Sequence, residues 1–321
     1  MSTRNISIDI LKFFAVLLIT NSHFSTLYVF GQQLATGGAI GDALFFFASG
    51  FCLFLSRRKD NFMFFYKRRI SRIYPTIFSW AILSSFLLGN QKSMCEIVIS
   101  GGGWFVSCIM VYYVFTYFIH KKTERFSKLL CGVWALCMIP LFFLLNHGEN
   151  IYSDGLFRFC FFFLFMLMGM ILSCRQMLKI EKPGLELAKI LVCASIFYGV
   201  SFLAAKRPSL NALQLLTIPA LMGLTYYLWR LSNCEFLARL YNSKLIGFVI
   251  KLIGGLCLQI YVVQHQLITD KMNFLFPLNL LLMLAIIVMA AYVLKCCSTF
   301  FSQTFKDQEY NWKDVFKLLS Y

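Results

Sequence analysis

The sequence predicts an all-α polytopic membrane protein with about ten transmembrane helices. Hydrophobic residues make up 59% of its 321 residues, only 14% are charged, and the mean hydropathy is +0.71. So few polar groups could not cover the surface of an ordinary soluble domain. The apolar residues form runs close to the length of about 20 residues that a helix needs to cross a bilayer. The predicted spans cover residues 8–28, 39–55, 74–89, 104–120, 129–146, 156–174, 188–205, 211–230, 246–268 and 277–297.

The basic residues are distributed unevenly between the two sides of these spans. Only Lys92, Arg158, Lys206, Arg207 and Lys271 fall on one side, and the rest of the 30 lysines and arginines fall on the other. Because cytoplasmic loops carry the excess of positive charge, both termini are predicted to be cytoplasmic. The loops on the opposite side are short, so we expect a single integral membrane domain over residues 1–321.

Charge and cysteine content exclude two other classes of protein. The net charge is +16, but the basic residues occur in short clusters between apolar runs, which is typical of membrane loops and not of a nucleic-acid partner. The twelve cysteines are scattered, without CxxC or Cys/His ligand spacing. We therefore expect neither a metal site nor a disulfide framework.

The first span contains two ionisable residues, Lys12 and His23. Eleven helical steps bring their side chains to within about 20° of each other, about 16 Å apart along the axis. Ionisable groups inside a span are costly, which makes both residues functional candidates. The alternative is a snorkelling Lys12 and a hydrogen-bonded, structural His23.

The densest basic cluster lies in the first cytoplasmic loop. It consists of Arg57-Arg58-Lys59, Lys67-Arg68-Arg69 and Arg72, followed by Tyr74-Pro75. On a helix, Arg68 and Arg69 lie four and three residues before Arg72, and guanidinium groups bind phosphate with two hydrogen bonds. We assign Arg57, Arg58 and Lys59 to topology and to attraction of anionic lipids. Arg68, Arg69 and Arg72 are expected to bind a phosphorylated ligand that arrives from the cytoplasm, and topology with lipid attraction is the alternative for them too. Pro75 is expected in the first turn of the third span.

Three ordered motifs within about the first 75 residues resemble acyltransferase family three, the bacterial membrane O-acyltransferases that act on surface polysaccharides. They are a basic residue followed eleven positions later by histidine (Lys12 and His23), the run Gly41-Asp42-Ala43-Leu44-Phe45-Phe46-Phe47-Ala48-Ser49-Gly50-Phe51, and the run Phe65-Tyr66-Lys67-Arg68-Arg69-Ile70-Ser71-Arg72-Ile73-Tyr74-Pro75. Later landmarks, Trp104-Phe105, Gly169-Met170 and Ile260-Tyr261-Val262-Val263, extend the resemblance over most of the chain.

The resemblance implies transfer of an acyl group, most often acetyl, from cytoplasmic acyl-CoA to a sugar hydroxyl across the bacterial cytoplasmic (inner) membrane. His23, in the outer third of its span, is the expected catalytic residue, either as general base or as transient acyl carrier. Lys12, Arg68, Arg69 and Arg72 are expected to bind the donor. The acceptor is a surface or lipid-linked polysaccharide, and the other partners are membrane lipids.

The chain departs from the family pattern at three places. Lys12 replaces the usual arginine and keeps the charge without the planar fork. In many members an aspartate lies one position after the place of Asp42, and a histidine lies one position before the place of His265. The resemblance therefore transfers no catalytic role to Asp42 or to His265.

Three residues are candidates for the acceptor side. Arg158 either contacts negative groups of the acceptor or pairs with Asp154. Trp104 fits an interfacial aromatic belt as well as it fits sugar stacking, and His265 is the one rival to His23. Before Trp104, the Gly101-Gly102-Gly103 run predicts a bendable loop with close backbone approach.

A polysaccharide polymerase or a transporter of lipid-linked sugars is the alternative function, and a non-catalytic membrane scaffold is a third. Both polymerases and transporters place charges within helices. The short outer loops argue against a polymerase, and the cytoplasmic position of the basic cluster favours a CoA donor.

Overall fold

The computed structural model describes residues 5–55, 61–120, 124–145, 150–152, 155–174, 180, 182–306 and 309–318. These residues form helices and connecting loops, and no strand occurs among them, which confirms the predicted all-α class. The chain divides into two compact units, which are described separately. The first comprises Met1–Ala15, Ala39–Arg58 and Phe118–Gly247, and the second comprises Val16–Gly38, Lys59–Tyr117 and Phe248–Tyr321.

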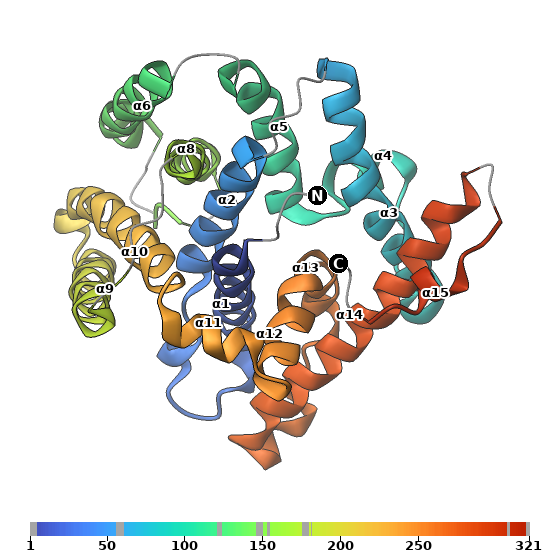
Figure 1. Cartoon of the computed structure of the whole chain (residues 1–321). Helices are drawn as coiled ribbons and strands as arrows, with labels where there is room; N and C mark the ends of the chain where they lie inside the picture. The colour runs from blue at the N-terminus through green and yellow to red at the C-terminus, as the bar shows by residue number, and fades with distance from the viewer. Residues whose placement is uncertain are drawn as a thin grey trace. The chain divides into compact units, whose positions relative to one another are not determined.

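The first unit is built mainly from helices of the middle of the chain. Within it, α9 lies beside α10, and α6 packs against α8 (Figure 1). A proline begins α9, where the missing N–H would have no intrahelical partner. Its elements are the start of α1 (Ile6–Ser22), α2 (Gly38–Leu55), α6 (Glu124–Leu145), α7 (Leu156–Phe161), α8 (Phe163–Ser173), α9 (Pro183–Lys206), η3 (Pro208–Leu216), α10 (Thr217–Leu231) and α11 (Glu235–Asn242).

Two glycines bring the backbones of α2 and α8 into contact. A Cβ atom at Gly50 would lie 2.1 Å from the carbonyl oxygen of Met166, and one at Gly169 would lie 2.1 Å from that of Phe47. Such close approach of two helices is typical of small residues in membrane proteins. The rows of phenylalanines on both helices are thereby packed into a fully buried core that includes Phe46, Phe47, Phe161, Phe162 and Phe165.

The second unit contains the two longest helices and the end of the chain. In it, α3 and α14 run side by side, and α13 packs against both (Figure 1). Its elements are the end of α1, η1 (Phe24–Leu27), η2 (Gln32–Leu34), α3 (Phe62–Leu88), α4 (Met94–Ser100), most of α5 (Gly103–His120), most of α12 (Leu245–Gly255), α13 (Cys257–Leu267), η4 (Asp270–Leu275), α14 (Leu278–Thr304) and α15 (Trp312–Val315).

The start of α3 differs from the prediction. The Asn61 side chain caps the helix by accepting a hydrogen bond from the Phe64 backbone N–H at 3.1 Å. Helix formation then continues through the basic residues, which are good helix formers. Pro75 therefore lies inside α3, so its predicted place in the first turn is wrong. The consequence is that one continuous helix carries both the basic cluster and the apolar residues that follow it.

The predicted span over residues 246–268 is broken. The axes of α12 and α13 differ by 76° at a break next to Leu256. Gly254 and Gly255 come directly before the break, and glycine lowers helix stability. Broken helices inside a membrane protein are tolerated where the exposed backbone is enclosed by protein or lines a cavity. The side chains of α13 next to this break are therefore candidates to line a cavity.

The number of membrane spans can be compared with the predicted ten. All ten predicted ranges are largely helical where described, and seven helices in the described part of the chain are long and apolar enough to cross a membrane. The number becomes eight if α12 and α13 form one bent span. In the most apolar stretch of α6 and of α9, only 11% of the residues are buried. The apolar surface that these two helices expose suits contact with lipid.

Candidate functional site

His23 and His265 are in direct contact. Their ring centroids lie 4.2 Å apart, with the ring planes inclined by 63°. His23 follows the last residue of α1, is half-buried, and donates its backbone N–H to the Thr20 carbonyl oxygen at 3.1 Å. His265 belongs to the last turn of α13 and is exposed. The structure thus joins the predicted catalytic residue to the histidine that the sequence suggested as its rival.

Gln264 connects the end of α1 to α13. The Gln264 side chain is completely buried, and its Oε1 atom accepts a hydrogen bond from Thr20 Oγ1 at 3.1 Å. A buried hydrogen bond between two helices restricts their relative movement. Because Thr20 precedes His23 by less than one turn and Gln264 adjoins His265, this bond fixes the backbones that carry both rings. No sequence pattern pointed to this role of Gln264.

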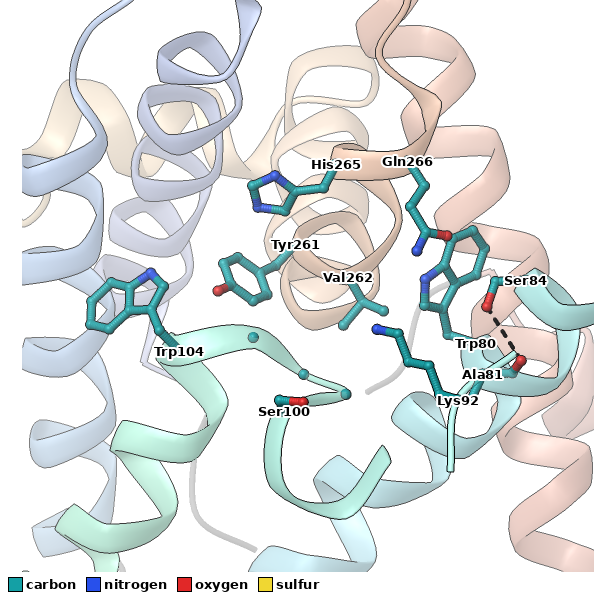
Figure 2. Close-up of a pocket in the computed structure, with 13 residues that line it drawn as sticks. Trp80, Ala81, Ser84, Lys92, Ser100, Trp104, Tyr261, Val262, His265 and Gln266 are labelled. Atoms are coloured by element: carbon teal, nitrogen blue, oxygen red, sulfur yellow. Dashed lines mark hydrogen bonds between the residues drawn. The ribbon is translucent and has the colours of Figure 1, made fainter. Parts of the chain in front are cut away.

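A cavity of about 220 Å³ within the second unit is lined by His265, and His23 contacts His265 but is not in the cavity wall. Figure 2 shows its wall built from α3, the turn between α4 and α5, and α13. Two residues that the sequence predicted for the acceptor side, Trp104 and His265, both line it. The other lining residues are Trp80, Ala81, Ser84, Lys92, Ser100, Gly101, Gly102, Gly103, Tyr261, Val262 and Gln266.

The glycine turn brings α5 close to α13. Gly103 has a φ of +67°, in the left-handed region that favours glycine, and a Cβ atom there would lie 3.0 Å from Tyr261 Oη. The predicted close backbone approach at this turn is confirmed. Trp104 follows directly, so the turn places its indole at the edge of the cavity, as Figure 2 shows.

The short helix α4 before this turn has a complete N-terminal cap. Ser93 Oγ accepts a hydrogen bond from the Glu96 backbone N–H, and Glu96 Oε2 accepts from the Ser93 backbone N–H at 2.7 Å and from its hydroxyl at 2.8 Å. These hydrogen bonds from Ser93 lower the pKa of the Glu96 carboxyl. The cap fixes the chain immediately after Lys92, which contributes a permanent charge to the cavity wall.

The cavity offers polar groups of complementary kinds. The buried Gln266 Oε1 atom has no hydrogen-bond partner in the described chain and is an acceptor available to a ligand. In Figure 2 the ammonium end of Lys92 is directed toward α13 near Val262, and the Tyr261 ring lies next to that of His265. The centroids of these two rings are 6.1 Å apart. Acceptor, cation, hydroxyl and aromatic faces together suit a hydroxylated, anionic ligand.

Lys92, Tyr261 and Gln266 were not predicted as site residues from the sequence. Lys92 was counted only as an outer-loop charge, and Tyr261 only as a landmark of the family resemblance. A signal for one of them was present, since Tyr261 and His265 are four residues apart and share a helix face.

The predicted donor-binding arginines lie on α3, in the same unit as the cavity. Arg69 is half-buried, with its guanidinium carbon 5.0 Å from the centroid of the Phe65 ring and 5.3 Å from that of the Tyr113 ring. Cation–π contacts of this kind fix the orientation of a guanidinium group. Arg72 is exposed and Arg68 is half-buried. Trp80 in the cavity wall follows Arg72 by eight residues, a rise of about 12 Å along the helix.

The remaining predicted site residues belong to the first unit. Arg158 Nη2 lies 3.6 Å from Asp42 Oδ2, and the two side chains are only 14% and 9% exposed. The partner predicted for Arg158, Asp154, lies outside the described residues, as do Arg57, Arg58 and Lys59. Asp42 thus has a structural role that the sequence did not reveal.

Lys12 is half-buried on α1. Asp9, one turn before it, accepts a hydrogen bond from Tyr241 Oη at 2.8 Å. No group of three or more metal-binding side chains occurs among the described residues, and the expectation of metal-free chemistry stays a prediction.

Comparison with known proteins identifies the family. A search of curated proteins and a search of solved structures gave no match. The model of the acyltransferase domain of family 3 matches residues 5–300, nearly the whole chain, which includes His23, the α3 arginines and all of the cavity wall. The chain therefore belongs to acyltransferase family 3 and is a multi-pass membrane acyltransferase.

Proposed function

We propose that this enzyme transfers an acyl group, most often acetyl, from cytoplasmic acyl-CoA to a hydroxyl group of a surface or lipid-linked polysaccharide. The observation that carries this proposal is the contact of His23 with His265, which itself lines a cavity that carries hydroxyl, amide and ammonium groups. A sugar hydroxyl is a weak nucleophile at neutral pH, and a neutral histidine is a suitable base for it. Trp104 and Gln266 supply the stacking surface and the acceptor that a sugar requires.

The reaction involves two bond changes. The acceptor hydroxyl oxygen attacks the thioester carbonyl carbon while His23 takes the hydroxyl proton. The carbon–sulfur bond then breaks, an oxygen ester forms, and the coenzyme A thiolate leaves and receives the proton from the His23 imidazolium. A direct transfer of this kind needs no metal ion. His265 holds the His23 ring in place through its edge-to-face contact.

The α3 helix supplies the donor side of the proposed reaction. Arg68, Arg69 and Arg72 would bind the phosphates of coenzyme A, because guanidinium groups form paired hydrogen bonds with phosphate. The same helix leads from these residues to Trp80 and Ala81 in the cavity wall. A donor held at the arginines could therefore extend its thioester arm along α3 toward the cavity. Lys12 is proposed as an additional contact of the donor phosphates.

The proposal requires a defined orientation in a bacterial inner membrane, with both termini in the cytoplasm. Single cysteines at the exposed positions Asn61 and Asn150 test it, on a background in which the native cysteines are replaced. A thiol reagent confined to the outside should label Asn150→Cys and spare Asn61→Cys. The reverse pattern would put the arginines on the wrong side for a cytoplasmic donor.

The activity itself is tested by mass spectrometry of surface glycans from a deletion strain, complemented with the wild-type gene. We expect one glycan to lose an acyl mass and to regain it on complementation. Purified enzyme should also bind coenzyme A and hydrolyse acetyl-CoA slowly without an acceptor. If no glycan changes and purified protein does neither, the proposed function is wrong.

A further inference from the structure

A second, larger cavity lies on the other side of α3. It has a volume of about 780 Å³ and is open and mainly apolar. Several of its apolar side chains are strongly exposed, among them Phe86 at 85%, Phe305 at 75% and Met94 at 67%. The residues that line this groove are Phe78, Ala81, Ile82, Ser85, Phe86, Gln91, Lys92, Met94, Ile97, Phe301 and Phe305, and all belong to the second unit.

The groove is continuous with the polar cavity. Ala81 and Lys92 line both. On α3, Phe78, Ile82 and Phe86 repeat every four residues and face the groove, whereas Trp80 and Ser84 face the polar cavity. One helix therefore separates the apolar groove from the cavity that carries hydroxyl, imidazole and amide groups, and the small side chain of Ala81 lies between them.

A single cation marks the place where the two spaces meet. Among the described residues that line the two cavities, Lys92 alone carries a permanent charge. Figure 2 shows its side chain directed from the loop before α4 toward α13. An ammonium group at the border of an apolar groove complements an anionic group carried on an apolar chain.

From this arrangement we propose that the acceptor is bound as a phosphorylated lipid. Its chain occupies the groove, its phosphate contacts Lys92, and its hydroxyl-bearing head group enters the polar cavity beside His265. This inference rests on the proposed function and adds to it the chemical form in which the acceptor is recognised. Acetyl-CoA does not match the groove, because it has phosphates but no long apolar chain.

Binding measurements without any acyl donor test the inference independently of catalysis. The probes are a long-chain polyprenyl phosphate, the corresponding polyprenol and inorganic phosphate, each titrated against purified wild-type protein in detergent. We expect the polyprenyl phosphate to bind about tenfold more tightly than the polyprenol, as one charge-assisted hydrogen bond allows. Inorganic phosphate should compete only weakly.

Four variants assign the contacts. Lys92→Gln should abolish the preference for the phosphate, and Lys92→Arg should keep it. Ile82→Trp should fill the groove and weaken both lipids alike. The matched control for the groove is Leu87→Trp, since Leu87 is 74% exposed on the same helix and lines neither cavity.

Several results would overturn the inference. Equal affinity of the wild type for polyprenyl phosphate and polyprenol would show that Lys92 does not recognise the phosphate. An equal loss in Leu87→Trp and Ile82→Trp would show ordinary lipid contact with the surface of α3. Complete competition by inorganic phosphate would show a free-anion site.

Failure of this inference is distinguishable from failure of the proposed function. Glycan acylation that persists without preferential binding of the lipid phosphate would overturn only the inference about the lipid. Preferential binding without any acyl transfer would overturn only the proposed reaction.

Discussion

The imidazole rings of His23 and His265 meet edge to face, with their centroids 4.2 Å apart. Each ring packs against the other across this contact, with the ring planes inclined by 63°. The pair also restricts the rotation of His23, whose backbone lies at the junction of α1 and η1.

The first prediction concerns His265 as a positioning residue. His265→Ala should lower kcat about 100-fold and leave KM for acyl-CoA unchanged. The reason is that a displaced His23 ring slows the proton transfer but does not alter the binding of the donor. His265→Phe retains a ring for the edge-to-face contact and should recover part of the loss. Steady-state kinetics on the purified variants measure both constants. A kcat within about threefold of wild type in His265→Ala would contradict a positioning role.

The second prediction concerns the arginines of α3. Arg72→Lys keeps the charge but loses the planar fork, so affinity for coenzyme A should fall about tenfold. Arg69→Ala should weaken binding too, with some loss of stability from its contacts with Phe65 and Tyr113. The matched control is Lys67→Gln, which removes an exposed charge from another face of the same helix. Titration calorimetry with coenzyme A measures the effect. Unchanged affinity in both arginine variants would return these residues to a role in topology.

The third prediction concerns the ion pair of Arg158 with Asp42. Asp42→Asn leaves a charged guanidinium group in a largely buried position, which should destabilise the protein by about 3 to 5 kcal/mol. The double variant Asp42→Asn with Arg158→Gln should be more stable than the sum of the two single losses implies. Thermal unfolding in detergent compares the four proteins. Strictly additive losses would show that the two side chains do not interact.

The fourth prediction concerns the contact between α2 and α8. Gly169→Ala would place a Cβ atom 2.1 Å from a backbone oxygen, which only a shift of a helix can relieve. We expect a loss of about 1 to 3 kcal/mol or more. Gly199→Ala is the matched control, because nothing lies within 4 Å of a Cβ atom there and helix propensity favours alanine. Equal thermal stability of the two variants would contradict the close packing.

Local sequence patterns predicted much of the fold. Apolar runs gave the helical ranges, and the motifs around His23 and Arg72 gave the family, because both depend on residues close together in the chain. The start of α3 was misplaced at Pro75, because the Asn61 cap and the helix propensity of the basic residues extend the helix toward the N-terminus.

Pairings between distant segments could not be predicted in the same way. The contacts of His23 with His265 and of Arg158 with Asp42 depend on helix packing, which no local pattern specifies. The break at Leu256 follows two glycines, a weak signal that also occurs in unbroken helices. Lys92 was overlooked because a lone loop lysine has no distinguishing spacing, and only the fold shows that two cavities meet beside it.

The fifth prediction addresses the central claim, that His23 is the base of the acyl transfer. His23→Ala should insert and express like wild type, since one polar side chain is lost from a half-buried position. Its acyl transfer should fall by about 10² to 10⁴, the range typical of a lost general base. The measurement is transfer of labelled acetyl from acetyl-CoA to membrane glycans, normalised to the amount of enzyme. A normally expressed His23→Ala that retains activity within about tenfold of wild type would contradict the assignment.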